Sequence, residues 1–207
     1  MPLNVRAAVV HAPNEPFVIE TLQLDGPGPG EVLIQVKSTG LCHSDLNAYE
    51  GKTPWAFPAL LGHEAAGMVV ECGPGVTQFK PGDRVIPFLI PFCGKCQYCH
   101  SPKTNLCVEG FNRLRPRESH FTLNGKPVSQ LWGLGTFADY TVLPPDTIVK
   151  VRDDAPFDSI WPEIVDWYAG KKIDLDSLIT HKLPLERIGE GFATMKSGES
   201  IRSVVIL

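Results

Sequence analysis

Four cysteines lie close together near the middle of the chain, separated by two, two and seven residues. They are Cys93, Cys96, Cys99 and Cys107. Four thiolates at such spacing satisfy a tetrahedral Zn²⁺ and leave no position open for a substrate. The residues between them are small or polar, so a metal is the natural organiser of the loop. We interpret residues 92–108 as a structural zinc lobe. Disulfide pairing is the alternative, which we disfavour because the N-terminus carries no export signal.

A second group of metal-ligating residue types is spread over two short motifs. Cys42-His43-Ser44-Asp45 follows an alternating apolar run, and Gly62-His63-Glu64 follows the apolar stretch 57–61. One thiol and one imidazole form the mixed ligand set of zinc sites that keep a position open for chemistry. Taken singly, a buried cysteine is usually a small hydrophobe and a lone histidine is usually structural. Together, beside a four-cysteine lobe, Cys42 and His63 predict an accessible metal site.

The elements that must position these residues read as mostly β. Glycine and proline contribute 19 residues each to the 207, which favours many turns over a helix bundle. Short apolar runs between turn signals predict strands at 6–11, 31–39, 68–72, 84–88, 137–143 and 147–151. The pattern then changes. We expect a helix from Pro162 to Gly170, a second from Pro184 to Gly198, and a last strand over 201–207.

Several of these motifs together resemble the medium-chain, zinc-dependent alcohol dehydrogenases. The run Gly62-His63-Glu64-Ala65-Ala66-Gly67, with Gly73 and Val76 after it, is similar to that family's zinc motif. The 120–142 segment is similar to the branch with a structural zinc lobe. The resemblance implies a mainly β fold with some α. It would be a GroES-like β-barrel catalytic domain over 1–157, and a C-terminal remnant over 158–207 of helices plus a final strand that packs back on the barrel.

The resemblance also implies a role for each residue of the accessible site. Cys42 and His63 would bind the catalytic zinc, and Glu64 would be the carboxylate that can approach the metal. Asp45 would fix the imidazole tautomer, while Ser44 would hydrogen-bond the alcohol and take its proton.

Three further positions follow from the same resemblance. Asn47 stands where many relatives have the histidine that ends the proton relay, so water would complete the path. His43 and Arg202 would contact the cofactor pyrophosphate, a role that suits the guanidinium fork. The implied reaction is hydride transfer from a primary alcohol to NAD(P), giving an aldehyde, with one structural and one catalytic zinc.

The substrate pocket is less well defined. Trp55, Phe57 and Leu89 fall near the family's pocket positions and favour an apolar or aromatic alcohol. The alternative, that these side chains are ordinary barrel core, stays open.

One departure from the family is large. Relatives carry a Rossmann domain between the barrel and the tail, but here residues 155–158 run straight into 159–162. No Gly-x-Gly-x-x-Gly follows a predicted strand. We expect NAD(P) to bind weakly and the family's third protein ligand to be missing, with Cys72 a poor replacement. A zinc-binding GroES-like module without turnover is the alternative function. The four-cysteine loop and the Gly62-His63-Glu64 motif disfavour a zinc-free reductase.

Charge and hydropathy exclude other classes. The formal net charge of −4 provides no electrostatic footprint for nucleic acid or an anionic membrane. No stretch approaches the roughly 20 apolar residues that span a bilayer. We expect a cytoplasmic protein whose partner is a small alcohol or aldehyde. We also expect self-association through the apolar face of the 162–170 helix, which packs on the Rossmann sheet in relatives.

Overall fold

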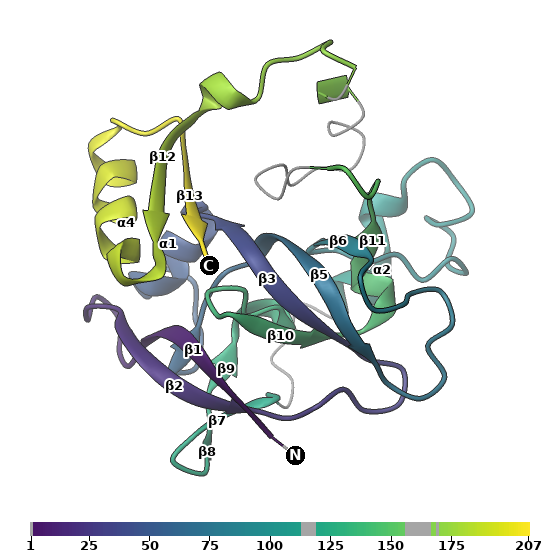
Figure 1. The fold of residues 1–207 in the computed structure, drawn as a ribbon, viewed down its shortest axis with the longest axis horizontal. Helices are drawn as coiled ribbons and strands as arrows, with labels where there is room; N and C mark the ends of the chain where they lie inside the picture. Colours follow the sequence, from purple (N-terminus) through teal and green to yellow (C-terminus); the bar gives the residue numbers. More distant parts are fainter. Residues whose placement is uncertain (1, 113–118, 156–166, 169) are drawn as a thin grey trace.

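The structure is a computed structural model and describes residues 2–112, 119–155, 167–168 and 170–207. Its strands form two sheets (Figure 1). The first has the order β8-β7-β2-β1-β4-β9. Its strands are β1 (Leu3–Val10), β2 (Val18–Leu24), β4 (Ala59–Leu60), β7 (Phe121–Leu123), β8 (Lys126–Pro127) and β9 (Ser129–Gln130).

The second sheet carries Glu64 of the accessible site. Its order is β11-β6-β5-β3-β13-β12, and β10 also pairs with β3. Its strands are β3 (Val32–Gly40), β5 (Glu64–Cys72), β6 (Arg84–Pro87), β10 (Tyr140–Leu143), β11 (Ile148–Lys150), β12 (Ile179–Pro184) and β13 (Arg202–Ile206). An isolated bridge between Ala7 and Ala138 ties it to the first sheet.

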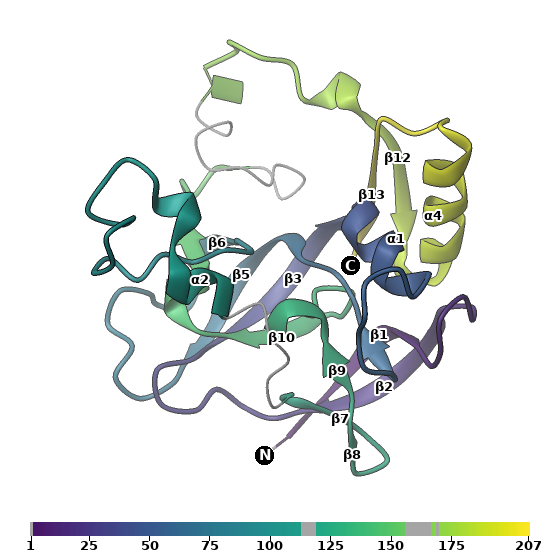
Figure 2. The same cartoon turned by 180° about the vertical axis from the view of Figure 1, so that it is seen from behind.

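Three α-helices flank these sheets in the part of the chain that the structure describes. They are α1 (His43–Tyr49), α2 (Val108–Asn112) and α4 (Ile188–Ser197). Figures 1 and 2 show α1 and α4 side by side at one end of the molecule, while α2 lies near β6 and β11 at the other. The two groups of candidate metal ligands are therefore held by different parts of the fold: the group with Cys42 lies at the start of α1, and the four-cysteine lobe lies next to α2.

Strand β3 is the central element, since three strands pair with it. Its first half pairs with β10, its second half pairs with β13, and β5 runs along its whole length with two register shifts. Val32 and Ile34 pack in one buried cluster and Leu33 in another, so both faces of the strand are covered. The strand ends at Gly40, opposite Glu64 of β5, which brings the two metal-ligating motifs together.

The C-terminal segment completes the sheet. Strand β12 and strand β13 are parallel and joined through α4, and β13 pairs antiparallel with β3. Helix α4 ends at Gly198, whose left-handed φ of 79° suits a residue without Cβ. A Cβ at Gly191 would lie 2.5 Å from Leu41, so this glycine lets α4 pack closely on the residue before Cys42.

The mainly β, barrel-like fold expected from the sequence is confirmed, with differences at element ends. Strand β5 begins at Glu64 rather than at residue 68. The polar side chain of Glu64 does not fit an apolar strand pattern, although its backbone pairs with β3. Strand β10 begins at Tyr140 rather than at residue 137. Helix α4 begins at Ile188, after a 3₁₀ turn over Leu185–Arg187. The helix expected over 162–170 falls largely outside the described residues. No helix in the described part is long and apolar enough to cross a membrane.

Candidate metal centres

The four cysteines of the 92–108 lobe converge as a metal site would require. The Sγ atoms of Cys93 and Cys99 lie 3.9 Å apart, those of Cys96 and Cys99 3.6 Å, and those of Cys96 and Cys107 4.0 Å. A tetrahedron with Zn–S bonds of about 2.3 Å has sulfur–sulfur edges of about 3.8 Å. The observed distances therefore fit a cluster suited to zinc and exceed a disulfide bond; all six cysteines are free.

The pKa values of the lobe's thiols explain why the lobe needs a cation. The backbone N–H of Cys99 leads the interactions that lower the pKa of Cys96 to about 6. Burial and the neighbouring thiols raise the pKa of Cys99 to about 11. The sulfur of Cys107 accepts N–H groups of Cys93 and Gly110, at 3.3 and 3.4 Å. Without a metal, one thiolate makes the next unfavourable, whereas a divalent cation stabilises all four.

The second centre brings together Cys42, His63 and Glu64. One ligand atom from each of these side chains lies within 4.8 Å of the others. Cys42 is the N-cap of α1, and its sulfur accepts the backbone N–H of Ser44 at 3.5 Å. Gly62, at φ 94°, turns the chain so that His63 faces the start of α1. Thiolate, imidazole and carboxylate are all zinc ligands, so the donor set fits that metal.

Asp45 orients the imidazole of His63. Its Oδ1 accepts the backbone N–H of Gly62 at 2.9 Å and lies 3.1 Å from Nδ1 of His63. Burial opposes a charged imidazole, but the interactions with Asp45 and Cys42 outweigh it and raise the pKa of His63 to about 10. Burial likewise opposes the Cys42 thiolate, yet the interaction with His63 lowers the pKa of Cys42. The surroundings of both side chains thus favour a negative charge on Cys42 beside a positive charge, and a metal ion would supply such a positive charge.

Glu64 has a second partner that the sequence did not indicate. Its Oε2 forms a short ion pair with Nη1 of Arg202, which also donates to the carbonyl of Leu41 at 3.4 Å. A Cβ at Gly40 would lie 2.5 Å from that Oε2, so the contact depends on glycine there. Arg202, which the resemblance assigned to the cofactor pyrophosphate, thus lies beside the metal-ligating motif.

The other predicted site residues lie at different depths. Ser44 is half-buried at the start of α1, whereas His43 and Asn47 are exposed on the same helix. Cys72 lies at the far end of β5 from Glu64, where its thiol donates to the carbonyl of Phe79 at 3.4 Å. It therefore does not join the accessible centre.

The three expected pocket side chains separate into two groups. Trp55 and Phe57 pack against the main core cluster, and Nε1 of Trp55 is buried without a partner among the described residues. Leu89 packs against a different cluster. Their role in a substrate pocket stays a prediction.

Trp132 is a neighbour of the site that sequence reasoning missed. Its indole meets the imidazole of His63 edge-on, with ring centroids 4.9 Å apart and planes at 76°. Its backbone is left-handed at φ 52°, which Gly133 and Gly135 on either side of Leu134 could have indicated.

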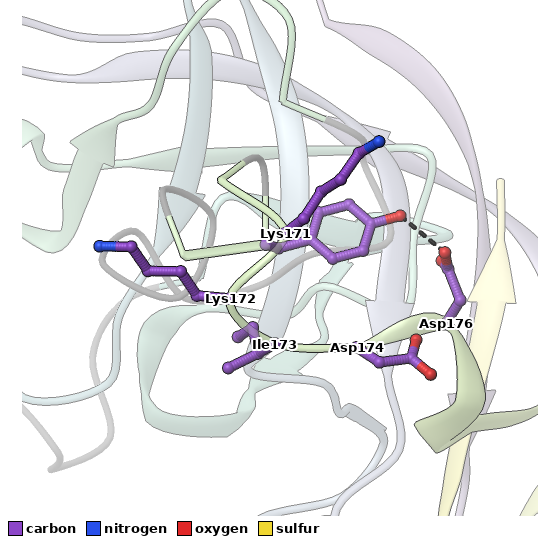
Figure 3. A pocket seen from close by; sticks show the side chains of 6 residues that line it. Lys171, Lys172, Ile173, Asp174 and Asp176 are labelled. Carbon is purple, nitrogen blue, oxygen red and sulfur yellow. Dashed lines mark hydrogen bonds between the residues drawn. The ribbon is translucent and has the colours of Figure 1, made fainter.

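A hollow elsewhere has no comparable chemistry. It is lined by Tyr168, Lys171, Lys172, Ile173, Asp174 and Asp176 (Figure 3). The hydroxyl of Tyr168 lies 2.8 Å from Oδ2 of Asp176, while the two lysine side chains extend in different directions. No set of donors converges there.

Comparisons with known proteins show the family. The family model described as the alcohol dehydrogenase GroES-like domain matches residues 28–153, more than half of the chain. The chain belongs to this family of zinc-dependent medium-chain alcohol dehydrogenases.

Its relatives are much longer. An alcohol dehydrogenase class-3 of Cereibacter sphaeroides is 47% identical over 165 residues, which make up 76% of this chain and 44% of that protein. An S-(hydroxymethyl)glutathione dehydrogenase of Paracoccus denitrificans is 45% identical, with the same coverage. The crystal structure of an alcohol dehydrogenase zinc-binding domain protein from Burkholderia ambifaria has a TM-score of 0.70 at 28% identity, and the match covers 89% of this chain and 52% of that one. The chain thus spans less than half the length of the curated relatives.

Proposed function

We propose that this chain is a zinc-dependent alcohol dehydrogenase polypeptide that oxidises a primary alcohol to an aldehyde with NAD(P). We further propose that it lacks the dinucleotide-binding domain that such folds place between the barrel and the last strand. The observation that carries the proposal is the convergence of Cys42, His63 and Glu64 within 4.8 Å, separate from the four-cysteine lobe. A closed zinc centre can stabilise the fold, whereas an accessible centre keeps a position at which a substrate can bind.

The chain's own residues have distinct tasks in this proposal. A zinc ion at the accessible centre would supply the Lewis acidity that makes an alcohol proton easier to remove near neutral pH. Cys42 and His63 would hold it, and Asp45 keeps the imidazole oriented through Nδ1. The half-buried hydroxyl of Ser44 would accept the alcohol proton and pass it outward. The exposed amide of Asn47 lies on the same helix, where water completes the exit.

Glu64 is the proposed third protein ligand, with water as the fourth. Its carboxylate is paired with Arg202, so it would have to exchange the guanidinium group for the metal ion. If Glu64 binds the metal, Glu64→Gln should weaken zinc at this centre, whereas Cys72→Ser should not. Equal zinc affinity in the Glu64→Gln variant and the wild type would exclude Glu64 as a ligand.

We expect NAD(P) to bind weakly. His43 is exposed and can meet a pyrophosphate, but Arg202 is engaged with Glu64. Most contacts to the adenosine and pyrophosphate in such folds come from the Rossmann sheet and its helix N-terminus. Calorimetric titration of NAD and NADP into the zinc-loaded chain measures this directly, and sub-millimolar affinity would contradict the expectation.

Turnover tests the proposal against its alternative. We would follow NAD(P) reduction at millimolar cofactor with ethanol, benzyl alcohol and S-(hydroxymethyl)glutathione, the last because a relative is named for it. We expect slow reduction that depends on Cys42, with Cys72→Ser as the matched control. An apolar or aromatic pocket would favour benzyl alcohol.

The alternative is a zinc-binding GroES-like module without turnover. It is favoured because few residues are expected to contact the cofactor: His43 is exposed, but Arg202 is paired with Glu64. If the zinc-loaded chain reduces neither cofactor with any of the three substrates, this alternative replaces the dehydrogenase proposal, and the metal centres keep only a structural role.

A further inference from the structure

The loop over residues 131–137 is joined directly to the peptide that carries His63. The backbone N–H of Thr136 donates to the carbonyl of Gly62 at 3.1 Å, and that of Phe137 donates to Leu61 at 3.1 Å. A Cβ on Gly62 would lie 2.5 Å from the side chains of both Thr136 and Phe137. The two segments therefore fit closely and must move together.

Trp132 has an unusual backbone within this loop. It adopts φ 52° and ψ 21°, a left-handed conformation that is unfavourable for a bulky side chain. Its neighbours stabilise the turn: Leu131 is fully buried, and Gly133 and Gly135 are also at positive φ. Such a conformation persists only where the surroundings enforce it, and it often marks a functional site.

The consequence of this backbone is the placement of the indole. Trp132 contacts His63 edge-on at 4.9 Å, while Asp45 binds Nδ1 of the same imidazole at 3.1 Å. Asp45 fixes which nitrogen faces α1, and the indole opposes rotation of the ring about its bond to Cβ. His63 is itself only 7% exposed, so the surrounding protein also restricts its movement.

We propose that Trp132 is a positioning residue for the accessible metal centre, which it serves by holding the His63 imidazole at the angle that metal binding requires. The inference rests on the proposed function, since it assumes a metal at Cys42 and His63. It adds a residue whose side chain is not a metal ligand and which acts through its ring contact with His63. An edge-on aromatic pair of this kind contributes enough to change metal affinity several-fold.

The experiment uses Co²⁺ as the probe, in the full chain with zinc retained in the cysteine lobe. Co²⁺ affinity and its visible absorption bands are measured for the wild type and for Trp132→Leu, Trp132→Phe and Trp167→Leu. Leucine keeps apolar bulk but lacks the ring, phenylalanine restores a ring edge, and Trp167 is a half-exposed control.

We expect Trp132→Leu to bind Co²⁺ roughly three- to tenfold more weakly, with shifted visible bands. Trp132→Phe should recover most of the affinity, and Trp167→Leu should match the wild type. Wild-type affinity and bands in Trp132→Leu would overturn the inference, as would equal losses in the leucine and phenylalanine variants. Failure of the wild type itself to bind Co²⁺ in a Cys42-dependent way would instead overturn the proposed function, and the inference with it.

Discussion

At the scale of single residues, Asp45 is the side chain on which the accessible centre depends most. It is fully buried, and its Oδ1 receives both the Gly62 N–H and the His63 ring. Its Oδ2 has no hydrogen-bond partner among the described residues. Burying a carboxylate in this way is costly unless a nearby positive charge compensates for it. A metal bound through His63 would supply that charge.

We therefore expect Asp45→Asn to lower zinc affinity at the accessible centre by about 10- to 100-fold, because the imidazole loses its charged partner. Zinc titration against a competing chelator measures the change. Asp83→Asn is the matched control, since Asp83 is also buried but pairs with Lys150 at 2.7 Å. Equal effects of the two substitutions on zinc affinity would show that Asp45 acts only on stability.

Gly62 offers a second residue-scale prediction. It has φ 94°, and an added Cβ would lie 2.5 Å from neighbouring side chains. Gly62→Ala should lower the free energy of unfolding by roughly 3 kcal/mol through strain and overpacking. Gly75→Ala, at φ 84° with no atom within 4 Å of the added Cβ, should cost only about 1 kcal/mol. Urea unfolding of both variants tests this, and equal losses would contradict it.

At the scale of elements, an ion pair joins α1 to α4. The Glu50 carboxylate after α1 lies 2.7 Å from Lys196 of α4 and 2.6 Å from Lys52. The two ammonium groups, Lys196 above all, lower the pKa of Glu50 to about 2, from an ordinary value of 4.5. The same end of the molecule holds a stack of three rings, in which Phe17 lies 5.2 Å from Tyr49 and 5.4 Å from Phe192. These contacts dock the C-terminal helix on the helix that begins next to Cys42.

Because the folded pKa of Glu50 is depressed, its stabilising effect is present above about pH 4.5 and is lost as the pH falls towards about 2. Glu50→Gln should therefore melt below the wild type at pH 7, and the gap between their Tm values should narrow on acidification. Comparing the two proteins at each pH cancels the common effect of metal loss. A gap that stays constant from pH 7 to pH 3 would contradict this assignment.

The elements also show what sequence reasoning can reach. The zinc lobe was predictable because its four ligands lie within fifteen residues. Strands β3 and β13 were predictable from their apolar runs. Strand β12 was missed because Thr180, His181 and Lys182 interrupt any apolar pattern, and only pairing with β13 makes it a strand.

The contacts around the accessible centre were out of reach for a related reason. Glu64 and Arg202 are 138 residues apart, and their ion pair follows from the pairing of both β5 and β13 with β3. The contact of Trp132 with His63 depends on a left-handed backbone that a tryptophan does not itself predict; only the nearby Gly133 and Gly135 hint at a turn there.

At the scale of the whole molecule, the C-terminal strand makes the last part of the chain integral to the barrel-like body. Val204, Val205 and Ile206 of β13 pair with residues 38–40 of β3, immediately before the motif that carries Cys42. Removal of residues 179–207 should therefore destabilise the accessible centre as well as the sheet.

Self-association is a further proposal at this scale. Trp167, Leu178 and Ile201 are large apolar residues that are 52%, 45% and 71% exposed. We expect light scattering to show growth in mean mass with concentration, reduced by Trp167→Lys, because apolar exposure of this size favours association. A monomer of constant mass at high concentration would count against it.

If the chain holds two separate metal centres, the number of zinc ions that it binds should fall stepwise as the ligands of each centre are removed. Zinc is counted in the purified wild type, in a variant with all four lobe cysteines changed to serine, and in that variant with Cys42→Ser added. We expect two, one and no zinc ions per chain, with the β-rich fold checked by circular dichroism. A folded lobe variant that retains no zinc would contradict the accessible centre and the function proposed from it.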